Sequence, residues 1–242
     1  MKEVNMIFSD YVKAHTNTYG LDLTDTQIDQ LQRFYEQVVT TNEHMNLTGI
    51  TDPEEFALKH VVDSLSCYDP KYFTKGATVI DLGTGAGFPG VPLGIYDPSL
   101  QITLFDSLQK RLRFLDAVIE DLDLQGLQTL HGRAEDLAHQ EYRESFDLLT
   151  SRAVARLSIL LEWGLPYVKV GGYMVALKGS IVQEELEESK RAVSILGGEI
   201  VEVKEVTLPT LEDKRAIVYI KKVKPTAKKY PRKPKEIKIK PL

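Results

Sequence analysis

The sequence predicts an α/β domain over residues 71–221, preceded by an all-helical segment, 1–70, and followed by a basic tail, 222–242. From residue 77 onward, short apolar or β-branched runs bounded by Gly, Pro and Asp alternate with segments of helical periodicity, which is typical of a parallel sheet covered by helices. Before that point, apolar residues recur at intervals of three or four. The first apolar run of the α/β part leads directly into a glycine-rich turn.

The composition is that of a soluble globular protein. Of the 242 residues, 43% are apolar and 27% are charged, and the mean hydropathy is −0.20. No stretch approaches the roughly 18 uninterrupted apolar residues of a membrane-spanning helix, and the N-terminus lacks the hydrophobic run of a secretory signal. We therefore expect a cytoplasmic protein with no membrane partner. Cys67 is the single cysteine, so a disulfide within the chain and a thiolate zinc cluster are excluded, and a core position is favoured over a nucleophilic role.

Two helices are predicted in the first 70 residues. Thr24 and Gln27 have the spacing of a capping box. Asp52 is suited to cap the second helix, with Pro53 at its first helical position. The apolar stripes consist of Ile28, Leu31, Tyr35 and Val38 in the first helix and of Leu58, Val61, Val62 and Leu65 in the second.

Seven strands are predicted in the α/β part, over residues 78–82, 102–105, 129–130, 146–150, 173–177, 200–206 and 216–221. Ser107 is positioned to cap the helix after the second strand, and Gly126 to end that helix in a left-handed conformation. A further helix over 184–196 should stop at Gly197. The last two strands are separated only by a loop at Pro209, so we expect them to pair in antiparallel fashion.

The net charge of −5 conceals an asymmetry between the two ends of the chain. Residues 221–242 hold ten Lys and Arg against Glu236 alone, a charge of +9, so the rest of the chain carries −14. Four prolines interrupt this segment, and we expect an extended arm with little to pack. Two interpretations stay open, a solubilising tail and an arm that binds phosphate groups.

The strongest local signal is the run VIDLGTGAGFPG, residues 79–90. It places an acidic residue and three glycines at alternate positions, Asp81, Gly83, Gly85 and Gly87. Glycines allow a sharp turn and the close approach of a ligand to the main chain. A G-x-G-x-x-G pattern ending at Gly90 is also present, so a nicotinamide dinucleotide has to be weighed against other cofactors.

Two carboxylates are expected to lie near this turn, and only the first of them helps to choose between these cofactors. Asp81 would face a pyrophosphate at a cost, but it suits a cationic ligand such as S-adenosylmethionine, which carries an ammonium and a sulfonium. Asp106 ends the second predicted strand, where it can accept hydrogen bonds from ribose hydroxyls of either cofactor. Alternatively, Asp106 is only the first charged residue of the next helix.

The glycine run resembles the Asp-x-Gly-x-Gly-x-Gly motif of class I methyltransferases, and the wider sequence resembles one family of them. The matching segments are, in order, NLTGITDPEEFALKHVVDSL (46–65), DLGTGAGFPGVPL (81–93), DSLQKRLRFL (106–115), RAED (133–136), SRAVA (151–155) and LKG (177–179). They extend over nearly the whole chain. The family is RsmG, also called GidB, which methylates N7 of a guanine in bacterial 16S ribosomal RNA.

The resemblance implies a fold, a cofactor and a substrate. The fold would be Rossmann-like, with a seven-stranded, mostly parallel sheet whose final strand is antiparallel. The cofactor would be S-adenosyl-L-methionine, and the partner 16S ribosomal RNA or a precursor of the small ribosomal subunit. We expect a monomer that needs neither metal nor membrane.

The resemblance also implies site residues, which join those inferred from the glycine run. Together the predicted cofactor-binding residues are Asp81, Gly83, Gly85, Phe88, Asp106, Ala134, Glu135 and Arg152. Backbone amides at 134 and 135 can read an adenine edge, and Phe88 can form an apolar wall. Each also has a structural alternative, namely core packing for Phe88, helix N-terminal charge for Glu135 and an ion pair for Arg152.

The predicted chemistry requires positioning more than acid or base catalysis. Guanine N7 has a lone pair in the ring plane and no proton to lose, so alignment of the reacting atoms is the main task. We expect Arg152 to hold the guanine O6 or the cofactor. His60, Asp63 and Lys178 also match the family pattern, with either a catalytic or a structural role.

The negative charge of the protein repels the phosphates of RNA, so we expect basic side chains on the surface that binds RNA. The tail and the exposed side of the helix bearing Lys110, Arg111 and Arg113 are candidates. If the tail binds RNA, deletion of 222–242 should flatten the salt dependence of binding and leave cofactor affinity intact. Two competing functions stay open, an NAD-dependent oxidoreductase and a non-catalytic RNA-binding module.

Overall fold

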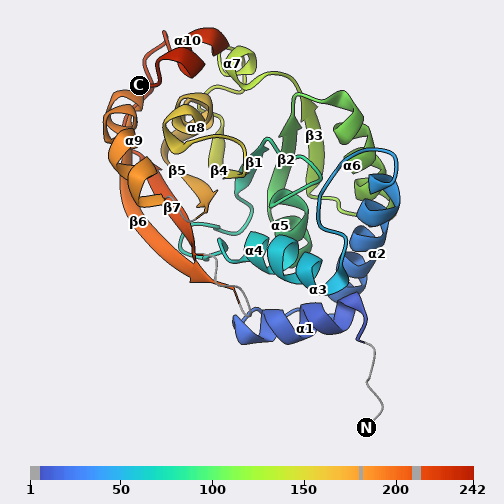
Figure 1. The fold of residues 1–242 in the computed structure, drawn as a ribbon. Helices are drawn as coiled ribbons and strands as arrows, with labels where there is room; N and C mark the ends of the chain where they lie inside the picture. The colour runs from blue at the N-terminus through green and yellow to red at the C-terminus, as the bar shows by residue number, and fades with distance from the viewer. Residues whose placement is uncertain (1–5, 180–181, 209–213) are drawn as a thin grey trace.

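The computed structural model describes residues 6–179, 182–208 and 214–242, which form a single sheet surrounded by helices (Figure 1). The strands are β1 (Thr78–Leu82), β2 (Gln101–Asp106), β3 (Leu127–His131), β4 (Phe146–Arg152), β5 (Val168–Lys178), β6 (Gly198–Thr207) and β7 (Lys214–Lys222). The helices are α1 (Phe8–Thr18), α2 (Asp25–Asn42), α3 (Pro53–Phe56), η1 (Ala57–Val62), α4 (Asp63–Leu65), α5 (Gly90–Tyr96), α6 (Gln109–Asp121), α7 (Ala134–Leu137), α8 (Leu157–Gly164), η2 (Leu165–Tyr167), α9 (Val182–Leu196) and α10 (Pro234–Ile239).

The sheet has the predicted architecture. Its strand order is β3-β2-β1-β4-β5-β7-β6, and β1 to β5 pair in parallel, with Val79 beside both Ile102 and Leu148. Only β7 runs the other way, so it is antiparallel to both β5 and β6. The predicted seven strands, the antiparallel final strand and the pairing of the last two strands are therefore confirmed.

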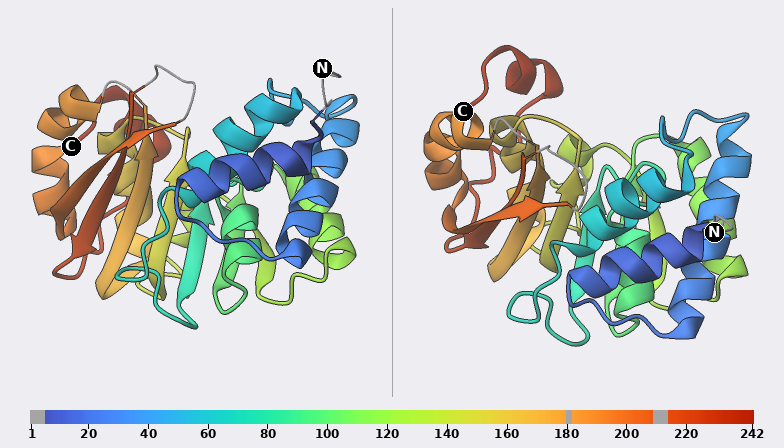
Figure 2. Two further views of the ribbon diagram at one scale, coloured as in Figure 1. Left: turned by 90° about the horizontal axis from the view of Figure 1, so that it is seen from below. Right: turned by 60° about the horizontal axis from the view of Figure 1, so that its bottom comes forward.

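The sheet separates two hydrophobic cores. Successive side chains of a strand point to opposite faces, so Val79 belongs to one core and Ile80 to the other. The first core contains residues of the N-terminal helices, α5 and α6, and the second contains residues of α8 and α9. Figure 2 shows the N-terminal helices and α9 on opposite sides of the molecule. Within the described residues, no helix combines the length and apolar character that crossing a membrane requires.

The predicted N-terminal helices form with their predicted caps. The hydroxyl of Thr24 accepts from the amide of Gln27 at 3.3 Å, and the side chain of Gln27 accepts from the amide of Thr24 at 2.9 Å. The Asp52 carboxylate accepts from the amide of Glu55 at 3.0 Å, with Pro53 at the first helical position. The second helix continues from α3 through the π-helical η1 and ends in α4.

Two predicted boundaries of α6 are wrong. The N-cap is Leu108, not Ser107, and the amide of Leu108 donates to the carboxylate of Asp106 at 2.8 Å. At the other end, Asp123 has the left-handed φ of 53° that was expected at Gly126. Gly126 is needed for space instead, because a Cβ there would lie 2.4 Å from the carbonyl oxygen of Leu100.

The end of α9 agrees with the prediction, since Gly197 follows it with a φ of +87°. The predicted loop at Pro209 lies outside the described residues.

The basic tail differs from the predicted extended arm. Its start belongs to β7, and its end forms α10, which lies beside α7 and α8 (Figure 1). Arg143 donates to the carbonyl oxygens of Thr226 and Tyr230, at 2.7 and 2.9 Å. Tyr230 and Ile237 are buried. The expectation of little packing is therefore wrong, because residues far away in the sequence supply polar and apolar partners for this segment.

Candidate functional site

The glycine turn after β1 depends on backbone conformations and space that only glycine provides. Gly83 and Gly85 have φ values of +72° and +61°, in the region that side chains disfavour. The amide of Gly83 donates to the carbonyl oxygen of Phe105 at 2.8 Å, which ties the turn to β2. A Cβ on Gly83 would lie 2.5 Å from Val154. Glycine is therefore required at position 83 for both its backbone conformation and its space, and at position 85 for its backbone conformation.

Asp81 is a buried structural centre beneath this turn. Its side chain is fully buried, and its two oxygens accept from the amide of Gly90 at 3.0 Å and from the hydroxyl of Thr150 at 3.2 Å. Burial raises the pKa of Asp81 to about 6. The carboxylate thus connects β1, β4 and the start of α5. Because this side chain is fully buried, direct contact with a cationic ligand would require the groups that cover it to move.

A cavity of about 330 Å³ opens beside the turn, at the carboxyl ends of β1 to β4. This edge of a parallel sheet is where such folds bind ligands. Four predicted residues line the cavity, Gly83, Asp106, Ala134 and Glu135. The other four, Asp81, Gly85, Phe88 and Arg152, are not among its lining residues. The structure therefore divides the predicted site into a cavity and a neighbouring cluster.

Asp106 is held rigidly at the cavity. It is 6% exposed, and its oxygens accept from the amides of Gly85 at 3.0 Å and of Leu108 at 2.8 Å. The guanidinium of Arg111 lies 3.5 Å from the same carboxylate. Since a carboxylate has about four lone-pair positions, Asp106 can still accept from a ligand hydroxyl. Gly85, although outside the cavity lining, orients this group.

The first turn of α7 lines the same cavity as Asp106. Ala134 begins this helix, and the hydroxyl of Tyr167 donates to its carbonyl oxygen at 2.7 Å. Glu135 is buried at 7% exposure. The hydrogen bond from the buried Tyr167 thus holds the backbone at Ala134 in place. A backbone that forms hydrogen bonds with the edge of a planar ligand has to be fixed in this way.

Arg152, at the end of β4, lies in a second cluster built on the N-terminal helices. Its terminal nitrogens donate to the carbonyl oxygen of Lys59 at 2.7 Å, to the carboxylate of Asp63 at 2.9 Å and to Nδ1 of His60 at 3.0 Å. A second arginine, Arg215, lies 3.1 Å from the other oxygen of Asp63. His60 and Asp63 therefore share a helix face, as predicted, and together they bind one guanidinium.

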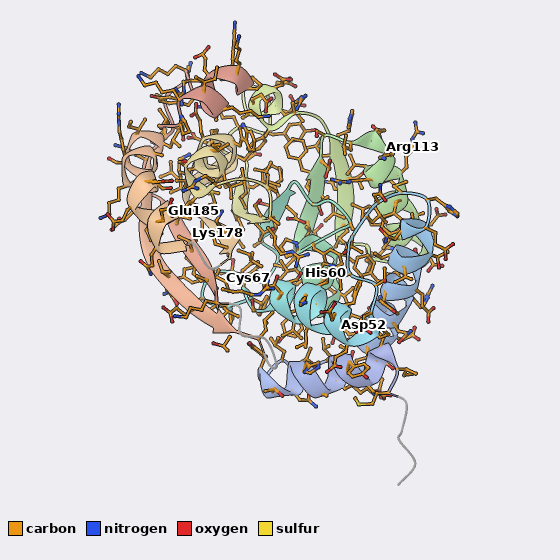
Figure 3. All side chains as sticks on the ribbon, viewed as in Figure 1. Asp52, His60, Cys67, Arg113, Lys178 and Glu185 are labelled. Atoms are coloured by element: carbon orange, nitrogen blue, oxygen red, sulfur yellow. The ribbon has the colours of Figure 1, made fainter. Side chains whose placement is uncertain are left out.

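The aromatic ring of Phe88 completes this cluster. It stacks on the imidazole of His60 with a centroid distance of 4.5 Å, and the Arg152 guanidinium lies 5.0 Å from its centroid. It also packs against Phe34 and Phe56, which agrees with the core-packing alternative. Figure 3 shows His60 on its helix beside the sheet. Burial and the nearby Arg152 charge lower the pKa of His60 to about 3, so the imidazole is neutral.

Lys178, at the end of β5, has a partner that the sequence did not indicate. Its ammonium lies 2.6 Å from the carboxylate of Glu185 on α9 and donates to the carbonyl oxygen of Ala155 at 2.8 Å (Figure 3). Glu185 also accepts from the amide of Leu157, at 2.6 Å. The pair connects β5 and α9 to the loop after β4, which favours a structural role for Lys178.

Sequence reasoning missed several residues of the cavity. Trp163 on α8 and Val154 after β4 line it, together with Arg133 and two residues of the tail, Pro234 and Lys238. Trp163 could have been noticed as the single tryptophan of the chain. The sequence around Pro234 and Lys238 does not indicate that they line a cavity, because their position depends on the contacts of the tail with α8.

Two further expectations can be compared with the structure. Cys67 is fully buried and its thiol pKa is raised by burial, which agrees with a core residue. Among the described residues, no group of three or more His, Cys, Asp or Glu side chains is arranged to hold a metal ion.

Comparison with known proteins gives a consistent result. The family model described as rRNA small subunit methyltransferase G matches residues 27–218. The Ribosomal RNA small subunit methyltransferase G of Alkaliphilus metalliredigens is 46% identical over 224 residues, which cover 92% of this chain and 94% of that protein. The protein of the same name from Lactobacillus johnsonii is 47% identical over 227 residues, covering 93% and 95%.

Solved structures share the fold at low sequence identity. M. jannaschii TYW2, solved in complex with AdoMet, superimposes with a TM-score of 0.53 at 13% identity, covering 67% of this chain and 76% of that one. This likeness supports the architecture alone. The family match and the long, closely similar relatives decide the question of family, and they confirm the resemblance seen in the sequence. The chain belongs to the rRNA small subunit methyltransferase G family.

Proposed function

We propose that this protein transfers the methyl group of S-adenosyl-L-methionine to N7 of a guanine in 16S ribosomal RNA. The observation that supports this most is the arrangement of Gly83, Asp106 and the Ala134–Glu135 pair around one cavity at the carboxyl ends of parallel strands. In a chain of this family, that cavity is the natural place for the methyl donor.

The residues present suit such a donor. S-adenosylmethionine, when bound, supplies an electrophilic methyl group. Asp106 would accept from the ribose hydroxyls, the backbone at Ala134 and Glu135 would meet the adenine edge, and Gly83 would let the ligand approach the turn. Trp163 also lines this cavity, and its indole N–H is buried and without a partner among the described residues. Such an unpaired donor points to a ligand with an acceptor.

Asp81 and Gly85 would support the donor indirectly, as positioning residues. The carboxylate of Asp81 fixes the start of α5 and the end of the glycine turn. Gly85 orients Asp106 through its amide. Both residues keep the turn in one conformation before a ligand arrives, which is how a preorganised site limits the entropy cost of binding.

On the acceptor side, we assign the Arg152 cluster to positioning. Methylation at N7 removes no proton before transfer, so a neutral His60 that acts as neither a general acid nor a general base is compatible with the reaction. The guanidinium of Arg152 donates to Asp63, His60 and Lys59 and lies beside the ring of Phe88. These contacts would hold Arg152 in one position near the edge of the guanine. Alignment of this kind contributes roughly 7 to 11 kcal/mol in favourable cases.

The RNA would meet basic side chains on the exposed surface. The tail presents seven exposed lysines, Lys224, Lys228, Lys229, Lys233, Lys235, Lys238 and Lys240. Arg113 extends outward from α6 (Figure 3). We propose 16S ribosomal RNA or a precursor particle of the small subunit as partner, which would place the reaction in the cytoplasm. A monomer is sufficient for this scheme.

The two competing functions have less support. An NAD-dependent oxidoreductase would share the sheet and the glycine turn, but family membership favours methyl transfer. A non-catalytic RNA-binding module would still bind RNA, so only turnover separates it from an enzyme.

The test is transfer of tritium from labelled S-adenosylmethionine to RNA, using deproteinised 16S RNA and 30S particles in parallel. We expect one guanine to become labelled, and the position to be cleaved by the strand-scission chemistry specific for 7-methylguanine. Calorimetry should show binding of S-adenosylmethionine and none of NADH. Asp106→Asn should weaken donor binding, whereas the exposed control Asp116→Asn on α6 should not. Absence of transfer to both RNA forms, with the donor bound, would favour the binding module.

A further inference from the structure

The tail contributes to the same cavity as the glycine turn. Pro234 and Lys238, both on α10, line it together with Gly83 and Asp106. The two pairs come from distant parts of the chain. This placement was not expected for a segment whose composition indicates a solvated basic arm.

The tail is fixed in this position by a buried ion pair. Glu162 on α8 is fully buried and accepts three hydrogen bonds from Arg232, from its backbone amide and Nε at 2.8 Å each and from a terminal nitrogen at 2.6 Å. The carbonyl oxygen of Pro231 lies 3.0 Å from the ring of His139. Two residues after Arg232 the chain enters α10, where Ile237 is fully buried. The helix α10 is therefore held in place by the ion pair that precedes it and by the buried side chain of Ile237.

The helix α8 presents neighbouring residues to the tail and to the cavity. Glu162 binds Arg232, and Trp163 is one of the residues that line the cavity. The indole N–H of Trp163 is buried and has no hydrogen-bond partner among the described residues. A buried donor without a partner costs free energy unless a ligand or water accepts from it. Trp163, Pro234 and Lys238 thus line the same cavity. Ala134 and Glu135 form another part of the lining.

We propose that α10 is a cofactor-binding element that closes the adenosine end of the cavity through Pro234 and Lys238, with Trp163 as the polar contact. The proposal rests on the proposed function, which assigns the cavity to S-adenosylmethionine. It gives the tail a role separate from RNA binding. Loss of α10 should then weaken donor binding when no RNA is present.

Trp163 is the only tryptophan of the chain, so its fluorescence reports on the cavity directly. The experiment titrates S-adenosylmethionine into the full-length protein and follows Trp163 emission, with calorimetry as an independent measure of affinity. The variants are a chain ending at Lys233, which retains the Arg232–Glu162 pair, and Lys238→Ala. Lys235→Ala is the matched control, since it removes the same charge from the same helix but does not line the cavity.

We expect saturable change of Trp163 emission in the natural protein. The chain ending at Lys233 should bind about tenfold more weakly, a difference of about 1.4 kcal/mol. Lys238→Ala should be weaker than Lys235→Ala, and Trp163→Phe should bind about fivefold more weakly by calorimetry, as expected when one hydrogen bond is removed. Circular dichroism of each variant shows whether it is folded. If the shortened chain is not folded, the test is the affinity of Lys238→Glu for S-adenosylmethionine compared with that of Lys235→Glu, and we expect Lys238→Glu to bind more weakly.

The proposal is overturned if the natural protein binds S-adenosylmethionine by calorimetry while Trp163 emission does not change and Lys238 variants bind like their Lys235 controls. Failure of the natural protein to bind the donor at all would instead count against the proposed function. The two failures are thus distinguishable.

Discussion

Arg232 in the tail surrounds the buried carboxylate of Glu162 with three hydrogen bonds, at 2.6 to 2.8 Å. Removal of the guanidinium by Arg232→Ala leaves a buried charge with only one of these donors, so we expect a loss of about 3 kcal/mol in the free energy of unfolding. The double variant Arg232→Ala, Glu162→Gln should recover part of it, since a neutral amide replaces the charge. Urea unfolding gives the free energy of unfolding of the natural protein, of Arg232→Ala and of the double variant. Equal midpoints for the natural protein and Arg232→Ala would contradict the assignment.

Gly83 allows a comparison of backbone strain with steric clash. Gly85→Ala should cost about 1 to 2 kcal/mol because of its left-handed φ, since the nearest atom to a Cβ is 3.9 Å away. Gly83→Ala adds the close approach to Val154 at 2.5 Å, so a further cost of about 1 to 3 kcal/mol is expected. Addition of Val154→Ala should restore that second part. Thermal unfolding provides the values, and equal destabilisation by both substitutions would show that the clash is absent.

The buried carboxylate of Asp81 should make stability depend on pH in a defined direction. Its pKa of about 6 in the folded protein lies above the unfolded value of 3.8. Between these values the folded state binds the extra proton, so this group favours folding at low pH and that contribution is lost as pH rises through 6. The size is about 3 kcal/mol at most.

The measurement is the difference in unfolding free energy between the natural protein and Asp81→Asn at about pH 3 to 7.5, a range that spans the pKa values of 3.8 and about 6. This difference cancels the contributions of other groups. We expect the natural protein to gain stability relative to Asp81→Asn as the pH falls through this range. A flat difference would mean that the carboxylate is charged throughout.

His60 should stay neutral at every pH used for assays. Its folded pKa of about 3 lies below the unfolded 6.5, so the unfolded state binds a proton first and stability contributed by this group falls as pH decreases from 6.5 toward 3. Nitrogen chemical shifts of the His60 ring, assigned with His60→Gln, should be constant between about pH 5 and 8. Methyl transfer should likewise show no pH dependence that His60→Gln removes. A midpoint near 6.5 in either measurement would refute this.

Tail lysines outside the cavity should contribute to RNA affinity only. Replacement of Lys228, Lys229 and Lys233 by Ala should reduce the salt slope of binding to single-stranded RNA by roughly 0.7 for each phosphate that is no longer neutralised, or about 2 in total. These residues are exposed and do not line the cavity, so the affinity for S-adenosylmethionine should not change. Filter binding at several salt concentrations tests the first expectation and calorimetry the second. If the salt slope of RNA binding does not change, the tail lysines do not bind RNA, and the solubilising role is favoured.

Part of the candidate site was predicted from the residues, Asp106 from its place at a strand end and Gly83 from the glycine run, whereas Glu135 was predicted from the family resemblance. The fold explains why these three lie together. Gly83, Asp106 and Glu135 are far apart in the sequence, but each lies at or just after the end of a parallel strand, and the carboxyl ends of such strands share one edge of the sheet. The partners of Arg152 were not predictable in the same way. Lys59 and Asp63 reach it from a helix that belongs to another layer, and their distance depends on how that helix packs.

The sequence by itself determined the seven strands, the helices α2, α6 and α9 and the helix that begins at Pro53, the caps at Thr24 and Asp52, and the glycine turn, because these depend on periodicity and on the φ preferences of neighbouring residues. Tertiary structure alone decided that Asp81 is buried beneath the turn and that the basic tail packs on α8. Arg232 and Glu162 are 70 positions apart, and no local preference links them. Their pairing is favourable only after the sheet and α8 have removed Glu162 from water, since an isolated buried carboxylate needs a partner.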